Sequence, residues 1–124
     1  MFGKVRGYEK TTEWEKIWKE PSATIVWGAM AQVKQLPIIW ASFPFHPFKT
    51  GTPLTNRTPT KDELLIGKHF IKELIAIFDI KTLIAVGNKG EETLKEMGHT
   101  MVKIRHPAHG GATLFREGVK KYLS

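Results

Sequence analysis

The stretch TLIAVGNKGEETLKEMGHTMVKIR, residues 82–105, decides the fold because it has the pattern of a strand, a helix and a second strand. Residues 82–87 form a short apolar run that ends on a glycine, as a buried strand does. Residues 88–97 favour a helix, and Gly98 stands where a residue just past a helix end is expected. Residues 101–105 form another short apolar run. This order predicts two parallel strands joined by a right-handed helical crossover.

Further helices are expected on both sides of this unit. Thr60 and Glu63 have the spacing of a capping box, which predicts a helix from Thr60 to about Phe78. The expected apolar face of this helix consists of Leu64, Ile71, Leu74, Ile75 and Phe78. Residues 112–123 predict a last helix. Strands that alternate with helices are typical of an α/β protein with a parallel sheet.

The first third of the chain adds one more helix and one more strand. Ser22 is the expected N-cap of an apolar stretch that runs through Val33. Its core-facing residues are expected to be Ile25, Met30 and Val33. The run PIIWASF, residues 37–43, predicts a third strand. The fold class is therefore a three-layer α/β/α arrangement with a short parallel sheet of about three strands, in which residues 1–21 are an irregular lead-in and residues 22–124 a single domain.

Composition excludes several classes of protein. The 124 residues are enough for one hydrophobic core, and 41% of them are hydrophobic, as in a globular protein. The chain has no cysteine, so it has no disulfide, cysteine nucleophile or cysteine-held metal. No apolar run approaches the roughly 20 residues that a membrane span needs. The N-terminus lacks a signal-peptide core, and the expected compartment is the cytoplasm.

The net charge of +7 is unevenly distributed. Residues 34–72 and 98–124 each carry +4, whereas residues 73–97 carry −2. These basic segments also hold the unusual loops, which favours a polyanion as the partner, and nucleic acid is the commonest cytoplasmic polyanion. The alternative interpretation is an ordinary solvated basic surface.

Three loops follow the expected strands, and the carboxyl ends of parallel strands meet at one edge of a sheet. The loop of residues 43–59 contains four prolines, so neither helix nor strand continues through it. The others are GNKG at 87–90 and HPAHGG at 106–111. Since long irregular segments in small domains are usually functional, we expect the site at this edge. GNKG by itself is compatible with phosphate binding or with a plain strand-to-helix turn.

The histidines do not have the spacing of a metal site. His46, His106 and His109 stand on two of these loops, but no H-x-x-x-H or carboxylate-rich pattern accompanies them. No strand-turn-helix G-x-S-x-G segment is present, which argues against a serine hydrolase. We therefore predict no metal and no cofactor.

Three motifs in order resemble the uracil-DNA glycosylase superfamily. They are WASFPFHPFKTGTPLTNRTPT at 40–60, IAVGNKG at 84–90 and RHPAHGGA at 105–112. The chain is most similar to bacterial and archaeal branches that carry N-R-x-P-T before a helix and a His-Pro motif after the last strand. The resemblance runs from about Pro21 to the C-terminus. It implies DNA base-excision repair by a hydrolase that cleaves the N-glycosidic bond of a base flipped out of the stack.

The resemblance also implies roles for residues of the His-Pro loop. His106 matches the catalytic histidine that hydrogen-bonds uracil O2 and stabilises the leaving anion. Pro107 would fix the loop. His109 and Gly110 lie in the segment, 108–111, that enters the minor groove behind the flipped nucleotide.

Other implied positions lie near the proline-rich loop. Asn56 and Arg57 match the segment that holds phosphate or braces the pocket, with a structural turn and helix cap as the alternative. Phe45 stands where an aromatic ring stacks on the base, although Phe43 and Phe48 compete for that role. Ala41 occupies the position of the asparagine that reads the uracil edge, and a methyl group makes no such hydrogen bonds.

The chain also lacks one family motif. Nothing in residues 1–37 resembles the glycine-containing loop that supplies the water-positioning side chain, so the resemblance is to an N-terminally shortened member. The missing strand of the family lies between the strand ending at Ala41 and the strand at 83–87. Those two strands must therefore pair directly, or another chain must fill the gap.

These observations predict a glycosylase-like protein that binds DNA through the loops at 43–59 and 106–111. The DNA is uracil-containing, single-stranded or duplex, and weak or no glycosylase activity is expected from this chain alone. The alternatives are a non-catalytic DNA-binding or protein-interaction module, and a fragment of a longer active glycosylase. No membrane partner is expected, and a monomer is favoured over a homodimer because Trp14 and Trp18 can cover the apolar surface.

Overall fold

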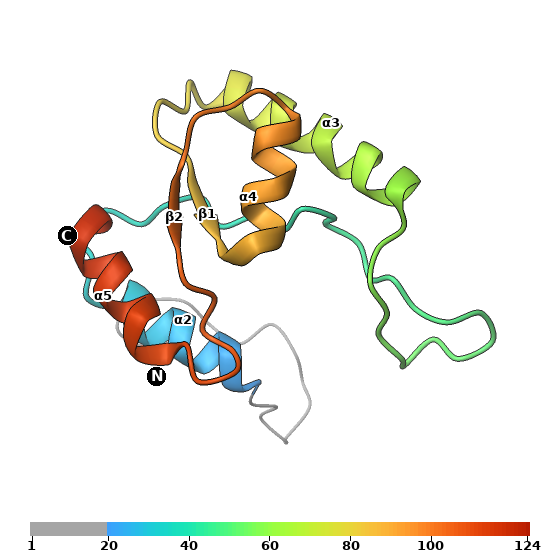
Figure 1. Ribbon diagram of the computed structural model, residues 1–124, viewed down its shortest axis with the longest axis horizontal. Helices are drawn as coiled ribbons and strands as arrows, with labels where there is room; N and C mark the ends of the chain where they lie inside the picture. The colour runs from blue at the N-terminus through green and yellow to red at the C-terminus, as the bar shows by residue number, and fades with distance from the viewer. Residues whose placement is uncertain (1–19) are drawn as a thin grey trace, which may run out of the picture. The chain divides into compact units, whose positions relative to one another are not determined.

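The computed structural model describes residues 20–124, which form a small mixed α/β arrangement of four helices and one sheet of two parallel strands (Figure 1). The predictions for Trp14, Trp18 and the rest of residues 1–19 lie outside the described residues. Within the described part, no helix has the length and apolar character needed to cross a membrane. The described residues divide into two compact units, one of residues 38–103 and one made from residues 20–37 together with 104–124.

The unit of residues 38–103 is built around the expected strand, helix and strand. Its elements are α3 (Lys61–Ile77), β1 (Ile84–Val86), α4 (Gly87–Glu96) and β2 (Val102–Ile104), whose last residue belongs to the other unit.

Short contacts hold α4 and the two strands of this unit together. The N–H of Val102 donates to the carbonyl of Leu83 at 3.0 Å. A Cβ on Gly90 would lie 3.6 Å from Cα of Ala85, so α4 packs directly on β1. Gly98 has a φ of +77°, the left-handed conformation that ends many helices. The two strands and the helix between them are confirmed.

Helix α3 begins where its capping box predicts. The Thr60 hydroxyl accepts from the N–H of Glu63 at 3.3 Å, and the Glu63 carboxylate accepts from the N–H of Thr60 at 2.8 Å. The expected apolar face is half-buried at four of its five positions. Phe78 is the exception, since it lies at the C-cap and is 57% exposed.

The third strand was predicted wrongly. Residues 38–43 form no strand, and the direct pairing with 83–87 is absent from the part of the chain that the structure describes. Ser42 explains why. Its carbonyl oxygen lies 1.8 Å from the position that a Cβ on Gly67 would take, and its hydroxyl lies 3.4 Å from the hydroxyl of Thr93. The segment is therefore bound to α3 and α4 instead of the sheet edge.

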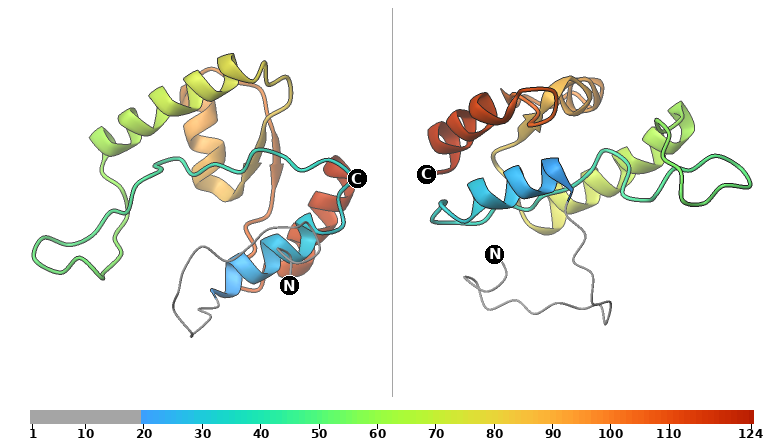
Figure 2. Two further views of the ribbon diagram at one scale, coloured as in Figure 1. Left: turned by 180° about the vertical axis from the view of Figure 1, so that it is seen from behind. Right: turned by 90° about the horizontal axis from the view of Figure 1, so that it is seen from below.

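In the other unit, α2 (Pro21–Met30) lies beside α5 (Ala112–Leu123) (Figures 1 and 2). The N-cap of α2 is Glu20, not Ser22 as predicted: its carboxylate accepts from the backbone N–H groups of Ser22 and Ala23. A carboxylate reaches these N–H groups from one residue before the proline, which itself suits the first helical position.

Each unit has its own small core. In the unit of residues 38–103 the buried apolar residues are Ala85 and Leu94. In the other unit they are Ala29, Met30, Val33, Ile104, Phe115 and Val119. Met30 and Val33 thus face the core as expected, whereas Ile25 is half-buried. The three-layer arrangement stays a prediction.

Candidate nucleic-acid site

The His-Pro loop, residues 105–111, is a tight turn between β2 and α5. The N–H of Gly111 donates to the carbonyl of Ala108 at 3.1 Å, and Pro107 is buried. A Cβ on Gly111 would lie 2.0 Å from the carbonyl oxygen of His106, so the two ends of the turn approach closely. The loop is therefore held by its own backbone.

The ring of His106 is oriented by this turn. Its Nδ1 atom accepts the N–H of Ala108 at 3.1 Å. A neutral imidazole that accepts at Nδ1 carries its proton on Nε2. Because His106 is exposed, Nε2–H is a donor presented toward solvent. A fixed donor of this kind is what a leaving anion requires.

His109 and Gly110 form the outer corner of the loop. Both have left-handed backbone conformations, with φ values of 53° and 75°, and both are exposed. Such a conformation costs little for glycine and is uncommon for a histidine. The corner therefore presents one side chain of any size, the imidazole of His109.

Glu20 supplies a carboxylate to the same unit. The backbone N–H groups of Ala23 and then Ser22 hold the pKa of Glu20 below its usual value. Sequence analysis missed this residue because Ser22 was taken as the cap. The signal was an acidic residue directly before a proline at a helix start.

Arg57 braces the proline-rich loop against α3. Its guanidinium makes a two-point contact with the Glu63 carboxylate, with both N–O distances at 2.7 Å. It also donates to the carbonyls of Phe48 at 2.9 Å and Thr58 at 3.2 Å. These contacts occupy four of the five N–H groups of an arginine. Arg57 thus ties the proline-rich loop to the first turn of α3, and its role toward phosphate or a base pocket stays a prediction.

The rest of the proline-rich loop is also fixed by short-range hydrogen bonds. The Thr55 hydroxyl accepts from the N–H of Lys49 at 3.1 Å and donates to the carbonyl of Thr52 at 2.7 Å. The His46 Nε2 atom lies 3.1 Å from the carbonyl of Pro53. In Figure 1 this segment runs away from α3 and α4 as an open loop.

The three competing phenylalanines differ in exposure. Phe45 is 57% exposed and makes edge-on contacts with Phe43 and Phe70, with ring centroids 5.5 and 5.7 Å apart. Phe48 is 43% exposed and stacks on His46 at 6.0 Å. Phe43 is half-buried. Phe45 is therefore the most exposed of the three, and its role in stacking on a base stays a prediction.

The expected site residues fall into both units. Ala41, Phe45, Asn56 and Arg57 belong to residues 38–103, whereas His106, Pro107, His109 and Gly110 belong to the other unit. The meeting of both groups at one edge stays a prediction. Ala41 and Asn56 are exposed.

Two further observations concern ligands. Across residues 20–124, no three histidine, aspartate or glutamate side chains are grouped as metal ligands would be. GNKG is the first turn of α4, directly after β1, and Gly87 has a φ of 77°.

Ion pairs are distributed unevenly between the units. All ion pairs among the described side chains lie within residues 38–103, where Lys49, Lys61 and Lys72 are the basic residues without one. In the other unit, five exposed basic residues have no carboxylate partner in the described structure: Lys34, Arg105, Arg116, Lys120 and Lys121. The spacing of Arg116 and Lys120, four apart on one helix, was a signal that sequence analysis did not use.

No family model, no curated protein sequence and no solved structure matches this chain.

Proposed function

We propose that this chain is a uracil-DNA glycosylase-like protein that binds DNA. The observation that carries the proposal is the set of five exposed basic side chains without carboxylate partners in the unit of the His-Pro loop. The described part of that unit contains only two acidic residues, Glu20 and Glu117. Unpaired cations on one unit are available to phosphates, whereas paired ones are already neutralised.

The orientation of His106 supports the glycosylase likeness. Its Nε2–H points outward from a turn that is closed by its own backbone. Pro107 anchors that turn by burial, and His109 stands at its exposed corner. A base-excision protein needs such a donor on the loop that receives a flipped nucleotide.

The proposal includes little or no glycosylase activity for this chain alone. The methyl group of Ala41 cannot read a base edge, and residues 1–37 contain no match to the family's water-positioning motif. The three-layer architecture and a cytoplasmic location are part of the same proposal. The proposal also includes the exposed side chains of Phe45 and Asn56, which belong to the proline-rich loop.

The test is binding to a fluorescent oligonucleotide at several salt concentrations. Each phosphate neutralised on duplex DNA lowers log K by roughly 0.9 per unit of log salt. We expect a salt slope that corresponds to several phosphate contacts. We also expect the affinity to stay the same, within measurement, when the oligonucleotide contains a single uracil. A protein that fails to bind at low salt, or whose affinity ignores salt, would exclude DNA as the partner.

A further inference from the structure

A groove between α2 and α5 collects polar groups that the His-Pro loop does not use. Its volume is about 230 Å³, and it lies entirely within one unit. The lining residues are Ala29, Gln32, Val33, Arg116, Val119, Lys120 and Ser124. No acidic side chain is among them.

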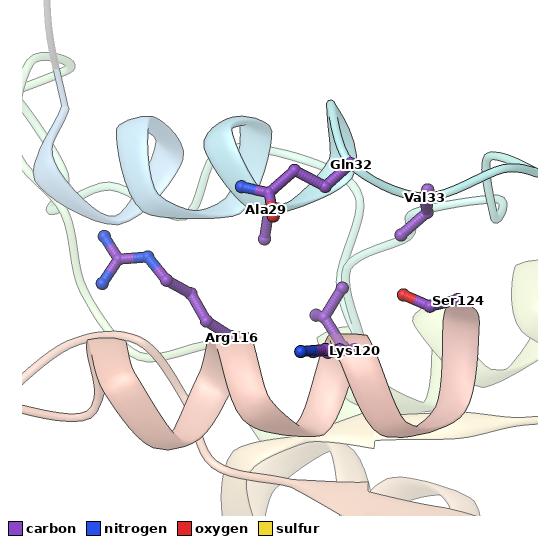
Figure 3. A pocket seen from close by; sticks show the side chains of 7 residues that line it. Ala29, Gln32, Val33, Arg116, Lys120 and Ser124 are labelled. Atoms are coloured by element: carbon purple, nitrogen blue, oxygen red, sulfur yellow. The ribbon is translucent and has the colours of Figure 1, made fainter.

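Arg116 and Lys120 make this groove cationic. They stand one turn apart on α5, and Figure 3 shows the Arg116 guanidinium reaching toward α2 with Lys120 further along the helix. Neither side chain has a hydrogen bond or ion pair with any part of the chain that the structure describes. Like charges four residues apart destabilise a helix slightly, so a bound anion removes a repulsion here.

The opposite wall and the floor complete the site. Gln32, just past the end of α2, lines the opposite wall. Its side chain runs back along α2, where the amide nitrogen donates to the carbonyl of Gly28 at 3.4 Å (Figure 3). Three apolar residues, Ala29, Val33 and Val119, form the floor of the groove. Each of them is only 3–4% exposed. Cations above an apolar floor suit a ligand with a charged group and an uncharged body.

We infer that this groove binds a backbone phosphate of a nucleic-acid strand, with Arg116 and Lys120 on the phosphate oxygens and the apolar floor against the sugar. The inference rests on the proposed function and specifies where on this unit the strand lies. Arg116 enters two-point contacts with phosphate oxygens, and Lys120 acts as a point charge beside it. The His-Pro loop leads directly into α5, so one strand can pass from His106 along this helix.

The experiment compares basic residues inside and outside the groove. Lys120→Gln and Arg116→Gln each remove a cation from the groove. Lys95→Gln removes the same charge from α4, where it does not line the groove and is already paired with Glu91 at 2.8 Å. We expect each groove variant to reduce the salt slope by about one phosphate contact, roughly 0.7–0.9, and Lys95→Gln to leave it unchanged.

A second measurement follows the Gln32 side-chain amide by NMR. We expect its signal to move when the oligonucleotide is added, and to move less in Lys120→Gln. If wild type binds the oligonucleotide and all three variants behave alike, the groove assignment is wrong while DNA binding stands. If inorganic phosphate alone moves the signal and the oligonucleotide does not, the groove holds a free anion and the nucleic-acid assignment is overturned. If wild type binds no oligonucleotide, both proposals fail.

Discussion

His106 illustrates how a short turn can orient one side chain. Its ring is held by the N–H of Ala108, so the Nε2–H donor is present whatever else the site contains. A positioned general base contributes about 10²–10⁴-fold to a rate. A two-point contact to a base adds roughly 1–3 kcal/mol of discrimination, and Ala41 cannot make one.

We therefore expect no strand cleavage when this chain is incubated with a single-uracil oligonucleotide and then treated with alkali. Binding should persist in His106→Ala, because phosphate contacts do not depend on the imidazole. Efficient cleavage at substoichiometric protein, lost in His106→Ala, would contradict the proposal of an inactive site.

Gly67 is a second position where a single atom matters. A Cβ there would lie 1.8 Å from the carbonyl oxygen of Ser42, a backbone atom that cannot move alone. We expect Gly67→Ala to lower the free energy of unfolding by about 1–3 kcal/mol, as overpacking does.

Gly28→Ala is the matched control for this substitution. It also lies inside a helix, and nothing stands within 4 Å of its Cβ position. It should raise the unfolding free energy by about 0.5–1 kcal/mol through helix propensity. Thermal unfolding of both variants measures whether each substitution lowers or raises the stability. Equal effects would mean that Ser42 does not pack on Gly67.

At the scale of elements, the start of α3 combines a helix cap with a contact to the proline-rich loop. The capping box fixes the first turn, and the same Glu63 carboxylate receives the Arg57 guanidinium. One carboxylate thus ties the proline-rich loop to the helix that follows it. Arg57 first, and then the N–H of Thr60, lower the pKa of Glu63 to about 2.

This shift predicts an acid dependence of stability. Because the pKa of folded Glu63 is below its unfolded value of 4.5, its stabilising contribution is present above pH 4.5 and is lost as the pH falls toward 2. Glu63→Gln should be less stable than wild type at pH 7 and should lose less stability between pH 5 and pH 2.

Glu73→Gln serves as the control on the same helix, since Glu73 has no ion pair among the described residues. Denaturant unfolding at several pH values measures the difference. A Glu63→Gln variant with the acid dependence of wild type would show that the Arg57 contact does not form in solution.

For the whole molecule, the exposed apolar residues raise the question of assembly. Ile38, Ile39 and Trp40 are each 47–48% exposed, and they lie within the segment 37–43 that was expected to be a strand. Exposed apolar patches favour association unless something covers them. Trp14 and Trp18 are the candidates for that cover.

We expect a monomer in sedimentation velocity at micromolar concentration. Trp14→Ala combined with Trp18→Ala should shift the protein toward a dimer, whereas Phe2→Ala should not. A wild-type dimer would mean that the residues before Glu20 do not shield this surface.

Local signals in the sequence determined much of this protein. Thr60 and Glu63 are three residues apart, and Gly98 needs only its own φ freedom, so the start of α3 and the end of α4 were predictable. The short runs at residues 82–87 and 101–105 also predicted the two strands, because such a pattern is a local signal. The His-Pro turn also closes within six residues, and its composition pointed to it as a site.

Only the tertiary structure decided what depends on distant partners. An apolar run becomes a strand when a neighbour accepts its hydrogen bonds, and residues 38–43 instead meet Gly67 and Thr93. The sequence left several roles open for Arg57, and only the structure shows its two-point contact with Glu63. The groove of Arg116 and Gln32 joins residues more than 80 positions apart, because packing of α2 on α5 brings them together. The spacing of residues along the chain does not indicate such contacts.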